Sequence, residues 1–282
     1  MMLPAYRIDS SLDGFAAIGR IYTEIREMTS REIEIDCQRL TWLGANMCAP
    51  LGAIMAGRRP RYVSLSENIE DILTKNQFLA GSRTDRFGTT ITFQEFKRDE
   101  RARFEQYIEH HFRGKGLPRM TSTLLRRFRE SLFELFENAV AHSDTRLGIF
   151  ACGQFFPKKN ELHFCIADRG VGIPARVGEF LRQTIRPCDA IEWAMSKQNT
   201  TRLVQDGLPG GLGLKLIREF IELNGGAIRV ASDTGYWSFR GKTTSSLMLP
   251  HGFPGTAVDI EINTADTKSY ALIDEFEQNE IF

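Results

Sequence analysis

Residues 121–143 constrain this fold most, because they form one long amphipathic helix whose apolar face must be buried against another layer. At 100° per residue, one broad face gathers the apolar side chains Phe128, Leu132, Leu135, Phe136, Ala139 and Val140. Glu134, Asn138 and His142 follow one another, one turn apart, along the border of that face, whereas Glu137 points away from it and is predicted to meet water. Two interpretations stay open from the helix alone: a solvated flank, or a ligand site that the helix lines.

The composition predicts a soluble globular protein. A chain of 282 residues with 42% hydrophobic and 26% charged residues forms one large domain or two modest ones. The 36 basic residues balance the 36 acidic ones, so there is no basic surplus of the kind that nucleic-acid binding favours. No signal peptide or membrane-spanning window is evident, and the five cysteines are scattered without a CxxC pair. We therefore expect a cytoplasmic protein with no disulfide framework, no structural zinc and no membrane or nucleic-acid partner.

The C-terminal half alternates strand and helix signals. "RLGIFACGQFF" and "ELHFCIAD" flank the turn composition "PKKN" and predict an antiparallel hairpin. "GLGLKLIREFIELNGG" predicts a helix with a glycine-rich entry, and three short strands are expected at 227–232, 244–250 and 256–262. The acidic tail from 263 onward is expected to be mobile or loosely docked. The fold class is therefore α+β, with helices covering one face of a mostly antiparallel sheet.

The N-terminal half gives weaker signals for a small α/β unit. A helix is expected at 12–28, strands at 31–36 and 61–66, and a small-residue helix at 46–57. The charge-rich stretch that follows is expected to be a connector with its own helix, closed by Gly114, Gly116 and Pro118. We therefore predict that the chain is organised in four segments: a regulatory or docking domain at 1–86, a helical connector at 87–120, the main α+β domain at 121–262 and the acidic tail at 263–282.

Three glycine-bearing stretches lie downstream of the long helix. In "IADRGVGIP", Asp168 ends a strand before Gly170 and Gly172, where a backbone without side chains lets a flat ligand come close and the carboxylate can accept from an amine. "GLPGGLGLKLI" places Gly210, Gly211 and Gly213 at a helix entry, where free N–H groups suit phosphate oxygens. "FPGTAVDIEI" carries Gly255-Thr256 before the last strand. Taken singly, each also fits an ordinary turn, a flexible loop or a strand start.

Together and in this order, these stretches resemble the GHKL (Bergerat-fold) ATP-binding superfamily of gyrases, ninety-kilodalton heat-shock chaperones, histidine kinases and MutL proteins. Glu134, Asn138 and Ala139 are similar to its N box, and Asp168-x-Gly170-x-Gly172 is similar to its first glycine box. "GGLGLKLIREFIELNGGAIRVAS" resembles the second glycine box, and Gly255-Thr256 resembles the closing Gly-Thr pair. The resemblance covers residues 121–262 and implies a sandwich of helices on a mixed, mostly antiparallel sheet.

The resemblance implies a role for each box. Asn138 would ligate Mg²⁺ through its amide oxygen, and Asp168 would accept from the adenine amino group of ATP. Glu134 would be the general base for a water or a protein hydroxyl. His142 would either touch a phosphate or interact with the helix C-terminus. The remaining residues implied to line the nucleotide are Gly170, Gly172, Ile173, Gly210, Gly211, Leu212, Gly213, Leu214 and Thr256, with residues 176–209 as the candidate lid.

Within the superfamily, the sequence argues against two large classes. His110 and His111 lack the acidic neighbour of a histidine-kinase phosphoacceptor, and the N box starts with Glu rather than His. About twenty residues follow the last expected strand, too few for the transducer domain of gyrases, chaperones and MutL proteins. The proteins left are those similar to anti-sigma-factor kinases and stand-alone ATP switches. Head-to-head dimers are common in the superfamily, and the sequence leaves the oligomeric state open.

Residues 10–85 resemble, less specifically, the STAS fold of the partners of anti-sigma-factor kinases; an unrelated α/β domain is the alternative. Where those partners carry an Asp-Ser phosphoacceptor, this chain has Gly44-Ala45-Asn46, which offers no hydroxyl. We therefore expect a docking or regulatory module for a protein partner. Three functions remain: an ATP-driven conformational switch with slow Mg²⁺-dependent hydrolysis, which we favour; a Ser/Thr kinase acting on a separate partner; and a nucleotide-binding module without turnover.

Overall fold

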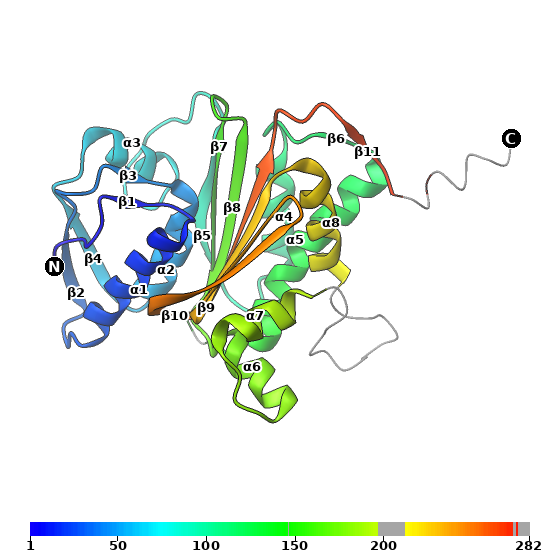
Figure 1. Ribbon diagram of the computed structural model, residues 1–282. Helices are drawn as coiled ribbons and strands as arrows, with labels where there is room; N and C mark the ends of the chain where they lie inside the picture. The colour runs from blue at the N-terminus through cyan, green and yellow to red at the C-terminus, as the bar shows by residue number, and fades with distance from the viewer. Residues whose placement is uncertain (146, 197–211, 273–274, 276–282) are drawn as a thin grey trace, which may run out of the picture.

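The centre of the molecule is a five-stranded sheet, in which every neighbouring pair of strands is antiparallel. The computed structural model describes residues 1–145, 147–196, 212–272 and 275. The strands lie in the order β5 (Thr90–Phe96), β7 (Ile149–Phe156), β8 (Glu161–Asp168), β10 (Thr243–Asn263) and β9 (Ala227–Arg240). Helices flank this sheet (Figure 1), so the predicted α+β class and the predicted hairpin of β7 and β8 are confirmed.

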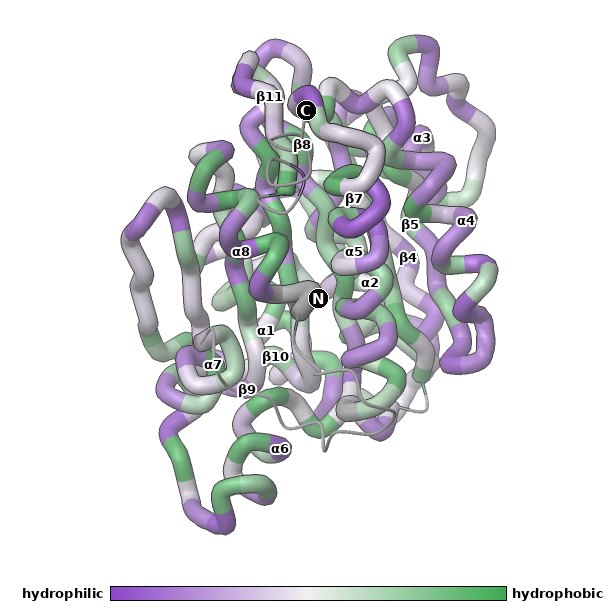
Figure 2. The backbone as a smooth tube through the Cα atoms, turned by 90° about the vertical axis from the view of Figure 1, so that its right-hand side faces the viewer, coloured by the Kyte–Doolittle hydropathy of each residue, from purple (hydrophilic) through white to green (hydrophobic). Residues whose placement is uncertain are grey.

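One face of the sheet is covered by helices from the C-terminal part of the chain. These are α4 (Arg101–Phe112), α5 (Ser122–His142) and α8 (Leu212–Asn224), with α6 (Gly172–Leu181) and α7 (Pro187–Met195) at one end of the sheet (Figures 1 and 2). The long helix α5 begins and ends as predicted, and the hydroxyl of Thr121 caps it by accepting from the N–H of Leu124. Phe128 and Phe136 are fully buried on its apolar face. Aromatic packing fixes α5 between α4 and α8. The ring centroids of Phe104 and Phe136 are 4.7 Å apart, and those of Phe128 and Phe220 are 5.2 Å apart.

The other face of the sheet is covered by the N-terminal elements (Figure 1). These elements are β1 (Arg7–Ile8), α1 (Leu12–Arg26), β2 (Glu32–Asp36), β3 (Trp42–Leu43), the 3₁₀ helix η1 (Ala45–Met47), α2 (Cys48–Met55), β4 (Arg59–Val63) and α3 (Glu67–Lys75). Their strands pair in parallel, β1 with β3 and β2 with β4. Helix α1 packs directly on β10. The two elements are so close that a Cβ atom at Gly19 would lie 2.2 Å from the carbonyl oxygen of His251, so glycine is needed at this position. The prediction that helices cover one face was therefore incomplete, since the sheet presents buried apolar residues on both faces.

A buried polar contact joins η1, which directly precedes α2, to the sheet. The side chain of Asn46 is 2% exposed, and its Nδ2 donates to Oδ1 of Asp259 at 2.7 Å. Arg229 approaches the other carboxylate oxygen of Asp259 at 3.0 Å, so this fully buried charge is paired. The segment Gly44-Ala45-Asn46 thus places an amide side chain against the chain's own sheet.

The segment 87–120 contains more structure than the sequence indicated. Its helix α4 is present as predicted, but β5 was missed, and this strand pairs with β7 at the edge of the central sheet. The alternating pattern of β5 is masked by its polar neighbours, and its pairing partner lies about sixty residues away in the chain. The prediction that Glu137 meets water was wrong. Its side chain is 16% exposed and forms an ion pair with Arg101 at the start of α4.

The last part of the chain departs from the expectation of three short strands and a loose tail. The two expected strands at 244–250 and 256–262 are one strand, β10, which tolerates its prolines because register shifts interrupt its pairing with β9 between Met248 and Thr256. In the tail, β11 (Ser269–Tyr270) pairs in parallel with β6 (Arg119–Met120). The ring of Tyr270 lies 5.3 Å from that of Phe220 and is 8% exposed, so this part of the tail is docked.

All five cysteines, Cys37, Cys48, Cys152, Cys165 and Cys188, are buried free thiols. Within the described ranges, no helix combines the length and hydrophobicity that a bilayer crossing requires.

Candidate functional site

Asp168 is the last residue of β8 and is 4% exposed. Its Oδ1 accepts from the N–H of Gly170 at 2.8 Å. Burial raises the pKa of this carboxyl group to about 7, and the backbone hydrogen bonds from Gly170 and Thr256 only partly counteract the burial. No cation pairs with Asp168 among the residues that the structure describes. A buried carboxylate without a cationic partner is costly, so this position suits a ligand that donates a hydrogen bond.

The turn after Asp168 is packed against the C-terminal end of α5. A Cβ at Gly170 would lie 2.0 Å from the carbonyl oxygen of Ser143, so only glycine fits there. That same carbonyl oxygen accepts from the N–H of Val171 at 2.8 Å. Gly172 then opens α6 with a φ of +80°, a conformation that favours glycine. The turn is therefore held against the C-terminal end of the helix that bears Glu134 and Asn138.

Ser232 organises the site from β9, and the sequence analysis missed it. Its hydroxyl is fully buried, donates to the carbonyl oxygen of Gly255 at 2.7 Å and accepts from the N–H of Ile173 at 2.9 Å. Thr256, on β10, lies opposite both Asp168 and Ser232 in the strand pairing, with 3.2 Å between the hydroxyls of Thr256 and Ser232. One signal could have found Ser232: a lone hydroxyl at the end of the apolar strand "AIRVAS".

Glu134 and Asn138 lie one turn apart on α5, and both are half-buried. His142 is the last residue of α5, and its side chain lies outside what the structure describes, as do Gly210 and Gly211. The backbones of Leu212, Gly213 and Leu214 form the first turn of α8, which packs beside α5. Of the predicted lid 176–209, the structure describes only the part up to residue 196, which carries α6 and α7.

One donor on α5 fits a magnesium ion that is shared with a ligand. The amide oxygen of Asn138 is a hard oxygen donor of the kind that Mg²⁺ prefers. Within the described ranges, no cluster of three or more His, Cys, Asp or Glu side chains could hold a metal by itself. A magnesium ion at this helix would therefore take most of its ligands from phosphate oxygens and water.

Comparison with known proteins agrees with this geometry. Residues 123–252 match the family model described as histidine kinase-, DNA gyrase B-, and HSP90-like ATPase. The matched segment is therefore similar to GHKL-type ATPase domains, a class that implies ATP binding. The matched segment contains α5, the turn after Asp168 and the start of α8, and it ends four residues before Thr256. No curated protein was found to match the chain.

Proposed function

We propose that this chain is a Mg²⁺-dependent ATP-binding protein that acts as a conformational switch with slow hydrolysis. The observation that carries this proposal is the position of Asp168 at the end of β8, next to the C-terminal end of the helix of Glu134 and Asn138; its carboxylate is buried and has no ion-pair partner among the described residues. The adenine amino group would donate to Asp168, and the backbone of Gly170, Gly172 and Ile173 would lie beside the base. Thr256 would complete this wall through its pairing with Asp168.

The phosphates would lie between α5 and the start of α8. The N–H groups of the glycine-rich entry, Gly210 to Leu214, suit phosphate oxygens. Asn138 would hold Mg²⁺, which neutralises phosphate charge when it is bound. Glu134 would take the proton of the attacking water, and His142 would contact a phosphate.

Asn138→Ala is expected to weaken Mg²⁺-ATP binding by about a hundredfold or more, because it removes the amide oxygen that would hold the ion. ATP affinity measured without Mg²⁺ should change much less, since the base-binding residues are intact. Titration calorimetry with and without the metal gives both values, and Glu130→Ala, an exposed position on the same helix, is the control. Equal affinity of Asn138→Ala and the parent protein for Mg²⁺-ATP would contradict the assigned role.

A switch needs a link between the nucleotide and the rest of the molecule, and Arg169 supplies one. It directly follows Asp168 in the chain, yet its side chain reaches the N-terminal elements. Its Nη1 donates to the carbonyl oxygen of Ala56, at the end of α2, at 3.3 Å, and its guanidinium lies 5.3 Å from the ring centre of Tyr22 on α1. A shift of the turn when ATP binds would therefore act directly on α1 and α2.

Arg169→Ala is expected to leave ATP binding in place but to remove the response of the N-terminal elements. Losing one hydrogen bond and one cation–π contact should destabilise the protein by about 1–2 kcal/mol. Hydrogen exchange of α1 and α2 with and without Mg²⁺-ATP measures the response, and Arg20→Ala, an exposed position on α1, is the control. An undiminished ATP-dependent change in Arg169→Ala would show that the signal travels elsewhere.

We propose that residues 1–86 are a STAS-like regulatory unit through which a protein partner acts on the switch. The η1 segment is already occupied by the chain's own sheet through Asn46, so a partner would dock on the outward surfaces of this unit. We further propose a cytoplasmic location and, as in other members of this class, the capacity to form a homodimer.

One experiment separates the three candidate reactions. The purified chain is incubated with Mg²⁺ and ATP labelled on the γ-phosphate, alone and with candidate partners. Release of labelled phosphate without labelled protein supports the hydrolytic switch. Acid-stable label on a serine or threonine of a partner supports the kinase alternative, and ATP binding with no turnover supports the binding module.

A further inference from the structure

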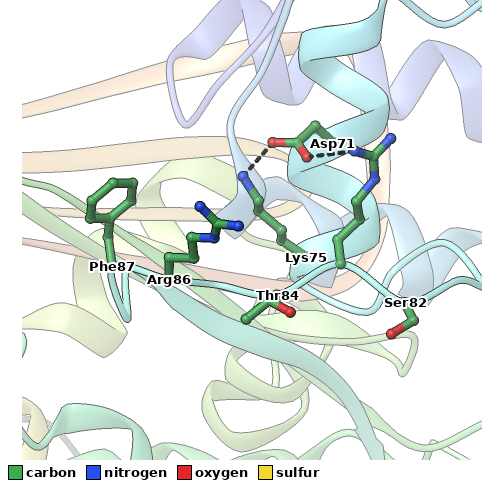
Figure 3. Close-up of a pocket in the computed structure, with 7 residues that line it drawn as sticks. Asp71, Lys75, Ser82, Thr84, Arg86 and Phe87 are labelled. Carbon is green, nitrogen blue, oxygen red and sulfur yellow. Dashed lines mark hydrogen bonds and ion pairs between the residues drawn. The ribbon is translucent and has the colours of Figure 1, made fainter.

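A cavity lies where the end of α3 meets the loop that leads into β5 (Figure 3). Its volume of about 560 Å³ falls within the range of small-molecule pockets. Its lining combines cations, hydroxyls, one carboxylate and one aromatic ring: Lys75, Arg83, Arg86, Ser82, Thr84, Asp71 and Phe87. None of these residues belongs to the segment that matches the ATPase family.

The loop that lines this cavity is held in place from behind. Asp85 turns its carboxylate toward β5, where Oδ2 accepts from both the N–H and the hydroxyl of Thr90 at 2.7 Å. Lys115 donates to the carbonyl oxygen of Gly88, so both sides of the turn are anchored. The loop therefore presents Arg86 and Phe87 outward from a fixed backbone, which lowers the entropic cost of binding a ligand.

The charges in the cavity do not balance. Asp71 pairs with Lys75 and lies 3.7 Å from Arg83, so a single carboxylate serves two cations. Arg86 extends toward Lys75 (Figure 3), and within the described residues its guanidinium has no hydrogen-bond or ion-pair partner. Three cations around one carboxylate leave a surplus of two positive charges. Like charges that point into one space are unfavourable unless an anion lies between them.

The ring of Phe87 adds a second requirement for the ligand. It lines the same cavity and is 87% exposed, the highest exposure among the exposed large hydrophobic residues described. An aromatic ring next to a guanidinium group is a stacking surface for a planar group. Ser82 and Thr84 add hydroxyl donors suited to phosphate oxygens.

We propose that this cavity binds a phosphomonoester dianion attached to a planar ring, such as a nucleoside monophosphate. The phosphate group carries about two negative charges near neutral pH, which match the surplus of two positive charges in the cavity. Arg86 and Lys75 contact the phosphate, Ser82 and Thr84 donate to its oxygens, and Phe87 stacks on the ring. The site lies on the N-terminal unit, so it is separate from the proposed ATP site.

Titration calorimetry on the full chain tests this proposal. The Asp168→Asn background is used, so that adenine binding at the proposed ATP site does not contribute. The probes are AMP, GMP, phenyl phosphate, inorganic phosphate and adenosine. The expected result is binding of the three ring-bearing phosphates, weaker binding of inorganic phosphate and none of adenosine. If phenyl phosphate binds as tightly as the nucleotides, the site recognises the phosphate and any planar ring. If the nucleotides bind more tightly, the site also recognises the nucleoside.

Two variants locate the binding. Arg86→Ala should weaken all phosphate ligands by about tenfold or more, because it removes a charged hydrogen-bond donor. Phe87→Ala should weaken only the ring-bearing ligands. Arg61→Ala, an exposed cation elsewhere on the N-terminal unit, is the control and should leave the affinities unchanged. Absence of heat with every phosphate probe, or an unchanged affinity in Arg86→Ala, would overturn the proposal without affecting the ATP site.

Discussion

Asp168→Asn is expected to lower the affinity for Mg²⁺-ATP by at least about a hundredfold. The substitution keeps the shape of the side chain, but it can turn an N–H₂ group toward the amino group of adenine, so that a donor faces a donor. Titration calorimetry measures the loss. The matched control is Asp233→Asn, the same change at an exposed residue on β9 whose φ of +50° asparagine tolerates. Unchanged ATP affinity in Asp168→Asn would remove the central residue of the proposed site.

The same variant should stabilise the protein in the absence of nucleotide, and the gain should depend on pH. Burial raises the pKa of Asp168 to about 7 in the folded chain, against an ordinary value of 3.8. Between these two values the folded state binds more protons than the unfolded state, so the free energy of unfolding falls as the pH rises. Above pH 7 the cost of the buried charge reaches about 4 kcal/mol at most. Asparagine avoids this cost.

Denaturant unfolding without ATP at pH 5 and pH 8 tests the direction of this pH dependence. Asp168→Asn should have a larger free energy of unfolding than the parent protein, and the difference should be larger at pH 8 than at pH 5. Saturating ATP should narrow this difference at pH 8 by about 2.7 kcal/mol or more, because a hundredfold higher affinity stabilises the parent protein by that much more than the variant. A stability difference that does not change with pH would mean that the carboxylate is not buried as the structure has it.

The parts of the site that sequence reasoning found are those with local signals. The period of α5 placed Glu134 and Asn138 on one border of the helix, since helical spacing fixes which side chains share a side. The turn after Asp168 was predicted because an acidic residue followed by two glycines at a strand end is a local turn pattern; its assignment to a ligand site needed the other glycine-bearing stretches as well. The nearby hairpin was found for the same reason, as its turn composition lies between two apolar runs.

The parts that were missed depend on contacts between distant segments. Ser232 shows only a weak local signal, a lone hydroxyl at the end of a strand, and its role becomes clear only when β9 is aligned with β10 and its hydroxyl meets Gly255. Arg169 looks like a surface residue until α1 and α2 are placed against the sheet. Strand β5 depends on β7 in the same way. Such pairings bring together residues that are far apart in the chain, and no local pattern encodes them.

Glu134→Gln is expected to reduce ATP hydrolysis by about a hundredfold or more while it changes ATP affinity little. General base catalysis contributes about 10²–10⁴ to a rate, and glutamine keeps the size and polarity of the side chain but cannot take a proton. Single-turnover release of ADP measures the chemical step, and calorimetry measures binding. Glu130→Gln is the matched control, because Glu130 lies one turn earlier on α5 and its side chain is half exposed.

The contrast between Glu134→Gln and Asp168→Asn separates catalysis from binding. A residue that acts only in the transition state lowers the rate of the chemical step and leaves the affinity for ATP intact, whereas a residue that holds the base lowers the affinity. If Glu134→Gln turns ATP over at the parent rate, Glu134 is not the base. If it loses affinity as Asp168→Asn does, Glu134 serves binding, and the base must be sought elsewhere.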